Sequence, residues 1–501
     1  MFSLGRSLAL KPLRLFRRCC FLGASAALLG PLATLATEAK SPEDAAIGPK
    51  QRLLVLTDIE ADPDDAQSLI RLLLYSNQID LTGLVATTSV HKPRTLHADS
   101  IRRIIDTYGE VRDNLLLHEL GYPTVEHLQS LVAEGQPQAG VAAIGDGRDS
   151  SGSRAIIAAL QSPDPRPLWV AVWGGVNTLA QALHTIRATN EPDEAARLIA
   201  KLRVYTISDQ DDAGPWIRRE FPDLFYIVSP GGYGASIWIA ITAPIDGIDN
   251  TTVSNPWLRE HIQQGHGPLG AAYPDVSYGL EGDTPSFLGL IPNGLNVPDQ
   301  PDWGGWGGRY ELKIPDPATL DLSGFIGIPY VAETRPIWTN AVDVYAPVEP
   351  QEFRRAFVPS KRTFKDVKVT LWRWRDEFQN DFAARMDWAT QPYAEANHPP
   401  VPRLDHPDRF TVRSGEVFNL SALGTTDPDG DSLSYLWFHY PEIGGWEEEI
   451  KTHIYAANIY WVPVKAPTVS APRDAHFILK VTDKGSPALT RYRRVIVTIL
   501  P

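Results

Sequence analysis

The chain has 501 residues, of which 43% are hydrophobic, and its formal net charge is −13. This length exceeds one ordinary domain, and the composition is neither that of a disordered chain nor that of a fibrous one. The acidic balance argues against non-specific binding to nucleic-acid backbones, which requires clustered lysine and arginine.

Residues 1–36 have the pattern of an export signal. Basic residues precede an apolar run that extends to Leu35, and small residues follow at the expected cleavage site. Both cysteines of the chain, Cys19 and Cys20, lie in this segment, so we expect the mature protein to contain no disulfide. No later stretch reaches the ~20 apolar residues of a membrane span. We therefore expect a secreted or periplasmic protein, with residues 37–50 as a polar linker.

Residues 51–396 alternate between apolar segments of strand length and segments with helical spacing. This alternation predicts an α/β domain with a mostly parallel sheet and flanking helices. In such folds ligands bind at the carboxyl ends of the strands. The predicted strands are 53–56, 79–89, 167–173, 203–207 and 225–228, and the predicted helices are 66–75, 99–108, 124–134, 153–161 and 177–189. Residues 244–350 are rich in Gly, Pro, Trp and Asn, which is typical of long loops around a site.

The proline-rich run at 397–402 is the best domain boundary, because such a run is stiff and extended. Short alternating segments follow it over residues 397–501 and predict a β-sandwich. The run Asp427-Pro-Asp429-Gly-Asp431 resembles bacterial cadherin-like and PKD-type modules of the immunoglobulin-like class. Its alternating acids are compatible with a structural Ca²⁺ and equally with a polar turn.

Five carboxylates lie within eight positions between the first predicted strand and the first predicted helix: Asp58, Glu60, Asp62, Asp64 and Asp65. Anions crowded in this way are costly unless a positive charge neutralises them. A hard divalent cation such as Ca²⁺ accepts six to eight oxygen ligands in irregular geometry. Helix capping by Asp64 or Asp65 explains one or two of the acids at most. The stretch therefore predicts a metal site.

The spacing Asp-x-Glu-x-x-x-Asp-Asp resembles the Asp-x-Asp-x-x-x-Asp-Asp signature of the inosine-uridine nucleoside hydrolases. The closer resemblance is to a nucleoside-hydrolase-like family of secreted bacterial proteins described as cellulose-binding, which carry a C-terminal immunoglobulin-like domain. The resemblance implies a Ca²⁺ that binds a water and the hydroxyl groups of a sugar. It also implies the metal ligands, which are Asp58, Asp65, the backbone carbonyl of Trp173, and Asp283. For the Trp173 segment a plain tight turn at Gly174-Gly175 remains an alternative.

The resemblance implies hydrolysis by a water that a carboxylate activates at the metal, with Asp58 or Glu60 as the base. Glu60 stands where the family has an aspartate, and a base displaced by about 1 Å can cost ~10²-fold in rate. The family's histidine beside the late aspartate is missing here, which leaves Glu281, His261 and His266 as candidates for the leaving-group acid.

We expect four polar side chains to bind the substrate, namely Asp64, Asn177, Asp209 and Asp211. For the last two, the alternative is a helix start with Asp212 as its cap. Trp303 and Trp306, flanked by glycines, are expected to form an aromatic wall on which a sugar or a base stacks, unless they belong to the core. Trp372, Trp374 and Trp388 have helical spacing and are interpreted as packing residues.

Two functions follow from these observations. The first is a secreted, Ca²⁺-dependent hydrolase of N-glycosyl bonds in a nucleoside or a related glycoside. The second is a carbohydrate-binding protein that grips cellulose in the same cleft without cleaving it. The retained acids favour the first, whereas the missing histidine and the change to Glu60 favour the second.

Overall fold

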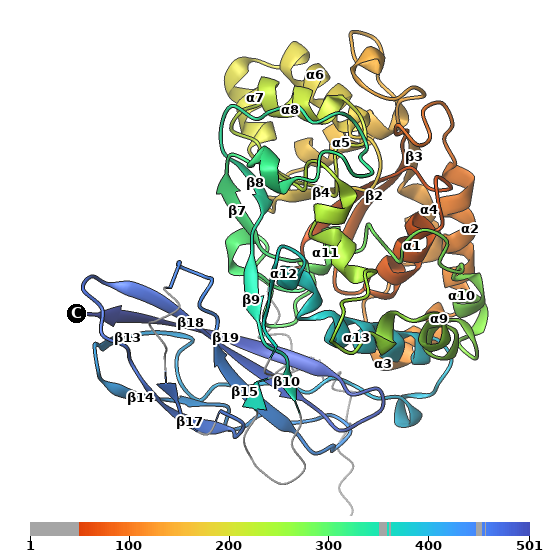
Figure 1. The fold of residues 1–501 in the computed structure, drawn as a ribbon. Helices are drawn as coiled ribbons and strands as arrows, with labels where there is room; N and C mark the ends of the chain where they lie inside the picture. The colour runs from red at the N-terminus through yellow and green to blue at the C-terminus, as the bar shows by residue number, and fades with distance from the viewer. Residues whose placement is uncertain (1–49, 350–357, 360–361, 447–452, 456) are drawn as a thin grey trace, which may run out of the picture. The chain divides into compact units, whose positions relative to one another are not determined.

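The computed structural model describes residues 50–349, 358–359, 362–446, 453–455 and 457–501, all of which belong to one compact unit (Figure 1). The predicted signal peptide and all but the last residue of the predicted linker lie outside the described residues. Among the residues described, no helix is both long and apolar enough to cross a membrane.

An eight-stranded sheet with the order β3-β2-β1-β4-β5-β6-β8-β7 forms the centre of the first part of the chain. Neighbouring strands are parallel except for the edge pair of β7 and β8. The predicted α/β fold with a mostly parallel sheet is confirmed. The strands are β1 (Arg52–Thr57), β2 (Asp80–Ala86), β3 (Val132–Glu134), β4 (Leu168–Val172), β5 (Leu202–Thr206), β6 (Phe225–Val228), β7 (Tyr310–Lys313) and β8 (Ile337–Asn340).

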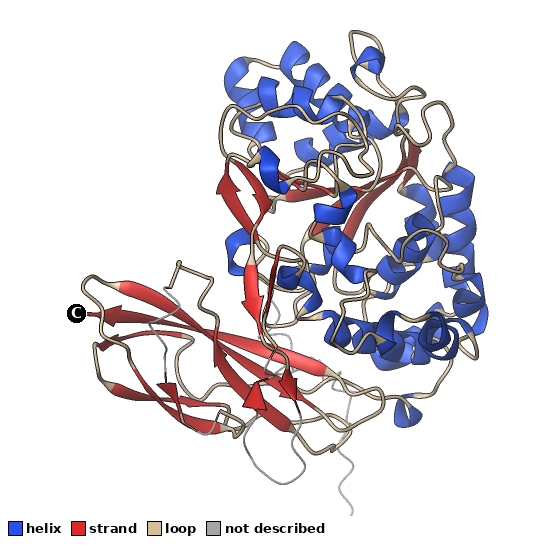
Figure 2. Cartoon of the chain, in the orientation of Figure 1, coloured by secondary structure: helices blue, strands red, loops and turns tan. Residues whose placement is uncertain are grey.

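Helices cover both faces of this sheet (Figure 2). Alternate residues of β1 point to opposite faces, so Leu53 and Val55 join one hydrophobic cluster and Leu54 and Leu56 join another. The first cluster contains residues of α1 (Asp64–Leu74), α2 (Ala98–Gly109) and α13 (Arg375–Asp387), and the second contains residues of α5 (Ser151–Gln161), α6 (Asn177–Thr189) and α8 (Ala213–Glu220). Burial of β1 and β4 on both faces explains why their sequences are continuously apolar.

The α-helices are α1 (Asp64–Leu74), α2 (Ala98–Gly109), α3 (Arg112–His118), α4 (Val125–Ser130), α5 (Ser151–Gln161), α6 (Asn177–Thr189), α7 (Pro192–Ile199), α8 (Ala213–Glu220), α9 (Asn255–Leu258), α10 (Gly267–Ala272), α11 (Pro285–Leu288), α12 (Val369–Trp372) and α13 (Arg375–Asp387). Their starts follow local chemistry: the side chains of Ser150 and Ser153 form a capping box at α5, and Pro192 begins α7. The helix predicted at 124–134 is shorter than expected, because the chain enters strand β3 at Val132.

The segment predicted as long loops, 244–350, also supplies β7 and β8 at the edge of the main sheet. Each has only four residues, which is too short for an alternating pattern to stand out. Two small antiparallel pairs follow, of β9 (Asp343–Tyr345) with β12 (Phe364–Asp366) and of β10 (Val348–Glu349) with β11 (Val358–Pro359).

The C-terminal part consists of a four-stranded sheet, β13-β19-β18-β15, and a three-stranded sheet, β14-β17-β16. A separate hydrophobic cluster that includes Trp437, Val462 and Phe477 takes residues from both sheets, which confirms the predicted β-sandwich. The strands are β13 (Arg409–Arg413), β14 (Val417–Ser421), β15 (Ser434–His439), β16 (His453–Ile454), β17 (Trp461–Lys465), β18 (Arg473–Thr482) and β19 (Thr490–Leu500).

The acidic run between β14 and β15 forms a turn that is tied to the linker before the sandwich. One oxygen of Asp427 accepts the backbone N–H groups of Asp429 and Asp431 at 2.9 and 3.0 Å. The carboxylate of Asp429 accepts the backbone N–H of His398 at 2.7 Å and lies 3.0 Å from its Nδ1. These bonds match the polar-turn alternative, and a structural Ca²⁺ at this run stays a prediction.

Candidate functional site

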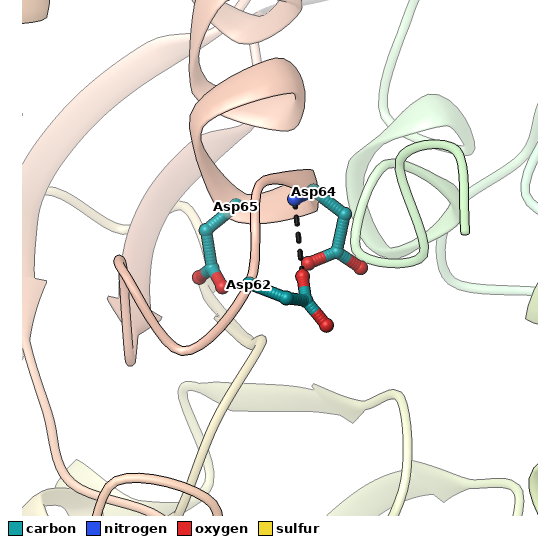
Figure 3. Close-up of side chains that lie close together, drawn as sticks. All are labelled: Asp62, Asp64 and Asp65. Atoms are coloured by element: carbon teal, nitrogen blue, oxygen red, sulfur yellow. Dashed lines mark hydrogen bonds between the residues drawn. The ribbon is translucent and has the colours of Figure 1, made fainter. Parts of the chain in front are cut away.

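Aspartates from three places in the chain meet at the carboxyl end of β1. Asp58 follows that strand, Asp64 and Asp65 begin helix α1, and Asp283 lies just before helix α11. Figure 3 shows how the carboxylates of Asp62, Asp64 and Asp65 converge, and one ligand oxygen from each lies within 4.8 Å of the others. We call these five residues the acidic group.

Burial and mutual repulsion disfavour ionisation of four of these residues, namely Asp58, Asp64, Asp65 and Asp283. Burial raises the pKa of Asp58 to about 6, although a hydrogen bond from the Ser89 hydroxyl opposes the shift. The pKa of Asp64 and that of Asp65 are raised well above their usual range by burial and then by neighbouring aspartates. The same holds for Asp283, on which the charges of Asp64, Asp65 and Asp58 act after burial. A bound cation would reverse this balance.

The carboxylate of Asp283 provides the sharpest sign that a cation belongs here. Its side chain is 1% exposed, and among the described residues its buried Oδ2 has no hydrogen-bond partner. A buried carboxylate oxygen without a partner is costly, so such atoms are nearly always satisfied in native proteins. Several carboxylate oxygens around one unpaired oxygen are the donor set that Ca²⁺ prefers. The residues present therefore fit the predicted metal.

Gly174, two residues after the end of strand β4, lies directly against the acidic group. A Cβ atom at Gly174 would lie 2.7 Å from the carboxyl carbon of Asp58, which is closer than real Cβ contacts allow. The carbonyl of the preceding residue, Trp173, accepts a hydrogen bond from Nε2 of Gln210 at 2.6 Å. A carbonyl oxygen has two lone pairs, so its role as a metal ligand stays a prediction.

Glu60, predicted as a base, does not lie among the acidic group. Its backbone has a φ of 74°, and its carboxylate accepts a hydrogen bond from Ser100 and pairs with His97 and Arg103 at 3.1 Å each. The Ser100 bond lowers the pKa of Glu60, and the neighbouring cations add to the effect. Asp62, which the sequence analysis counted among the five carboxylates but named neither as a metal ligand nor as a base, lies in the acidic group instead. The left-handed turn at Glu60 directs its side chain toward helix α2.

Three predicted substrate-binding residues have internal partners. Asn177 is fully buried, and its amide donates to Thr88 Oγ1 at 3.1 Å. The carboxylate of Asp211 accepts the backbone N–H groups of Asn177 and Ala213, and Asp209 pairs with Arg218 at 2.8 Å. These side chains connect the loops after β4 and β5, and their role in substrate binding stays a prediction. Asp64 alone of the four lies in the acidic group.

Of the predicted aromatic wall of Trp303 and Trp306, Trp306 lies in the core and Trp303 is half-buried. Trp306 is fully buried, and its ring packs edge-on against Phe378 and Tyr492. The ring of Trp303 lies edge-on against His476, at 4.6 Å between centroids. Trp306 is therefore a core residue, as the core alternative expected, whereas a role of Trp303 in stacking stays a prediction. Trp372, Trp374 and Trp388 are also buried, as interpreted.

Aromatic residues that the sequence analysis missed lie beside the acidic group. The hydroxyl of Tyr233 lies 3.0 Å from Nε2 of His91, and Phe325 stacks on the His91 ring at 5.5 Å. Burial raises the pKa of Tyr233, and so do the charges of Asp58, Asp209, Asp62 and Asp64. Trp238 packs edge-on against Tyr233 at 5.2 Å. His91 follows the end of β2, and its place after a parallel strand was the signal that could have identified it.

The three candidates for a leaving-group acid have other partners. Glu281 is buried in an ion pair with Arg71 at 2.6 Å and accepts a hydrogen bond from Tyr273. Nε2 of His266 lies 3.1 Å from Asp387, and the His261 ring packs on Trp257. The partners of these three side chains lie outside the acidic group.

Comparison with known families accounts for most of the chain. Residues 52–310 match the nucleoside hydrolase-like domain of cellulose-binding Sde182, and residues 417–499 match the C-terminal domain of cellulose-binding protein Sde0182. The chain belongs to this family. Its α/β sheet and its C-terminal sandwich are therefore the two modules of Sde182-like proteins.

A solved structure supports the assignment over nearly the whole chain. It is a nucleoside hydrolase-related hypothetical protein from Saccharophagus degradans that is associated with carbohydrate metabolism. The two chains share 35% identity with a TM-score of 0.73, and the match covers 90% of this chain and 100% of the other. A PKD domain from the KIAA 1837 protein matches 20% of this chain at 18% identity with a TM-score of 0.15. No curated protein matches the Sde182-like chain.

Proposed function

We propose that this protein is a Ca²⁺-dependent hydrolase of N-glycosyl bonds, acting on a nucleoside or a related glycoside. The observation that carries the proposal is the unpaired, buried Oδ2 of Asp283 within a group of four other aspartates. The nucleoside hydrolase-like fold supports the same class of reaction. We further propose that the protein acts outside the cytoplasm after removal of residues 1–36.

The ligands of the Ca²⁺ would come from the acidic group, with Asp62, Asp64 and Asp65 on one side and Asp283 on the other. When bound, Ca²⁺ would supply the positive charge that attracts a water and the sugar hydroxyls to the metal, beside the carboxylates. The hydroxyl of Thr57 donates a hydrogen bond to Asp65, and the hydroxyl of Ser89 donates one to Asp58. These bonds hold the two carboxylates in place. The site would thus be formed before the metal arrives.

Asp62 is the proposed proton acceptor for the attacking water. It is partly exposed, whereas Asp58, Asp65 and Asp283 are at most 3% exposed. One of its oxygens accepts the backbone N–H of Asp64 at 3.1 Å, which holds the carboxylate toward the group. A base in this position takes the proton as the water attacks the anomeric carbon.

Tyr233 is the proposed donor to the leaving group. Its raised pKa keeps the phenol protonated at neutral pH. If Nε2 of His91 carries its proton, it donates to the phenol oxygen and leaves the phenol proton for the departing atom. Trp238 and Phe325, which pack on Tyr233, hold the ring beside the acidic group.

Titration calorimetry of the EDTA-treated mature chain with Ca²⁺, followed by product analysis with nucleosides and cello-oligosaccharides, tests this proposal. Free base or free aglycone that appears only with Ca²⁺ would support it. Asp283→Asn serves as the matched variant, because the substitution removes the unpaired charge and preserves the shape of the side chain. Absence of Ca²⁺ uptake by the wild type would refute the metal site.

A second function, carbohydrate binding without cleavage, is favoured by one observation. Glu60 stands at the position of the family's catalytic aspartate, yet its carboxylate is engaged by Ser100, His97 and Arg103. The description of the matching family as cellulose-binding agrees with this function. Ca²⁺-dependent binding of cello-oligosaccharides with no product from any substrate would favour it over hydrolysis.

A further inference from the structure

An ion pair that the proposed chemistry does not use is buried where helix α1 meets the loop that carries Asp283, residues 281–284. The guanidinium of Arg71, in helix α1, pairs with the carboxylate of Glu281 at 2.6 Å between Nε and Oε2, and Nη2 donates to Oε1 at 3.1 Å. Both side chains are fully buried. Burying two charges often costs as much free energy as their attraction returns, so such a pair is weak evidence of a stabilising role.

The backbone of Glu281 is strained. Its φ is 46°, in the left-handed region that glycine adopts at little cost and that other residues avoid. Strain of this kind persists only where the surrounding contacts hold it, and it is concentrated at functional sites. Position 281 therefore needs a side chain, since glycine would adopt the same backbone conformation at lower cost.

Contacts from three sides fix the ion pair. Oε1 of Glu281 accepts a hydrogen bond from the hydroxyl of Tyr273 at 2.5 Å, and Oε2 accepts one from the hydroxyl of Thr284 at 2.8 Å. Nη2 of Arg71 also donates to the side-chain oxygen of Gln379, in helix α13. Because both partners are held by other groups, the pair is a fixed point between helices α1 and α13.

Helix α1 holds the backbone of the 281–284 loop through two more residues on the same face. The side-chain oxygen of Gln67 accepts the backbone N–H of Glu281 at 3.0 Å, and Oδ2 of Asp64 accepts that of Gly282 at 3.1 Å. Residues three and four positions apart lie on one face of a helix, so the ion pair lies one turn further along this row. The loop is thus attached to helix α1 along two turns.

We propose that Arg71 and Glu281 are positioning residues, which hold the 281–284 loop against helix α1 so that Asp283 lies in the acidic group before a ligand arrives. The proposal rests on the proposed function only where it concerns Ca²⁺. A set of ligands that is held in place in advance binds a cation more tightly than one that is ordered on binding. Neither side chain is itself a ligand, so both act through Asp283.

Hydrogen exchange of the full mature chain in EDTA tests the positioning itself, because it requires no metal. Glu281→Gly removes the carboxylate and leaves a residue that adopts the φ of 46° without strain. We expect the amide hydrogens of Gly282 and Ser286 to exchange at least about tenfold faster in this variant, with those of strand β1 unchanged. Glu281→Gln preserves the shape of the side chain and should restore part of the protection.

Titration calorimetry with Ca²⁺ measures the consequence for the acidic group. At a temperature where both proteins are folded, Glu281→Gly should bind Ca²⁺ at least about tenfold more weakly than the wild type. Asp343→Asn is the matched control, because it breaks another buried pair, with Arg309 at 2.7 Å, outside the acidic group. It should lower the melting temperature and leave both Ca²⁺ affinity and exchange at Gly282 unchanged. A merely structural role of Glu281 would give the same result as this control.

Arg71→Lys provides a second, milder test if Glu281→Gly does not fold, since it keeps the charge and removes the guanidinium fork. It should change exchange and affinity in the same directions. Unchanged exchange at Gly282 in the folded variants would overturn the proposal, and so would faster exchange with unchanged Ca²⁺ affinity. Failure of the wild type to bind Ca²⁺ would refute the metal site instead, and exchange in EDTA would still decide whether the ion pair positions the loop.

Discussion

The backbone N–H of Gly282 donates to Oδ2 of Asp64 at 3.1 Å, which ties the loop carrying Asp283 to the first turn of helix α1. A Cβ atom on Gly282 would lie 2.8 Å from that same oxygen and 3.1 Å from the ring of Trp238. Only glycine fits at position 282 without displacing Asp64 or Trp238. This contact explains how a distant aspartate joins the acids that follow β1.

Replacement of Asp283 by Asn should weaken Ca²⁺ binding by about a hundredfold, because it removes one charged ligand from the group. Titration calorimetry measures the loss. Asp302→Asn is a suitable control, since burial also raises the pKa of Asp302 but Asp302 lies outside the acidic group. An unchanged affinity in Asp283→Asn would remove Asp283 from the ligand set.

Stabilisation by Ca²⁺ should increase with pH. Asp58 has its pKa raised to about 6 in the folded chain, above its value of 3.8 when exposed, so the metal-free folded state holds the extra proton between these values. Metal-free stability therefore falls as pH rises through this window. Ca²⁺ binds the ionised carboxylates, so its effect should be small at pH 5 and full at pH 8.

Thermal unfolding with EDTA or Ca²⁺ at both pH values measures this difference. At a Ca²⁺ concentration 100 times the Kd, the gain at pH 8 should be about 2.7 kcal/mol. Asp283→Asn should show little gain at either pH. Equal Ca²⁺ stabilisation of the wild type at pH 5 and pH 8 would contradict the assignment of buried carboxylates as ligands.

Asp62→Asn should reduce turnover by at least about 10²-fold if Asp62 accepts the proton, whereas Glu60→Gln should change it by less than about tenfold. The two substitutions remove the same charge from neighbouring positions, one within the acidic group and one paired with helix α2. Calorimetry of both variants separates loss of the metal from loss of the base. A large defect in Glu60→Gln with normal Ca²⁺ binding would restore Glu60 as the base.

Gly174→Ala should destabilise the protein by about 1 to 3 kcal/mol and weaken Ca²⁺ binding, because the added methyl group would displace the Asp58 carboxylate. Gly279→Ala provides the control, since its Cβ would meet no atom closer than 3.8 Å. Denaturant unfolding and calorimetry measure the two effects. If Gly174→Ala bound Ca²⁺ normally, Asp58 would not be needed at the metal.

Trp306→Ala should destabilise the chain by about 3 to 5 kcal/mol, because it empties the space of a fully buried indole. At a temperature where the variant remains folded, its affinity for substrate should be unchanged. Denaturant unfolding measures the first effect, and binding of the substrate used for the wild type measures the second. Weakened binding by a variant of normal stability would place Trp306 in the site after all.

The sequence by itself determined the features that depend on neighbours along the chain. The apolar run before Asp58 and the helical spacing after Asp65 predict a strand and a helix, and their junction is the carboxyl end of a parallel strand. Acids crowded at that end predict a cation from charge alone. The alternation in the C-terminal part likewise predicts a sandwich, since burial on one face imposes a period of two.

Only the tertiary structure decided which side chains meet. Glu60 and Asp62 are both acids of the same turn, yet a positive φ at Glu60 directs it to Arg103 and leaves Asp62 with the group. Trp306 looks exposed in a glycine-rich loop, but Tyr492 of the last strand packs against it. These outcomes depend on backbone conformation and on contacts between distant segments, which the spacing of residues along the chain does not encode.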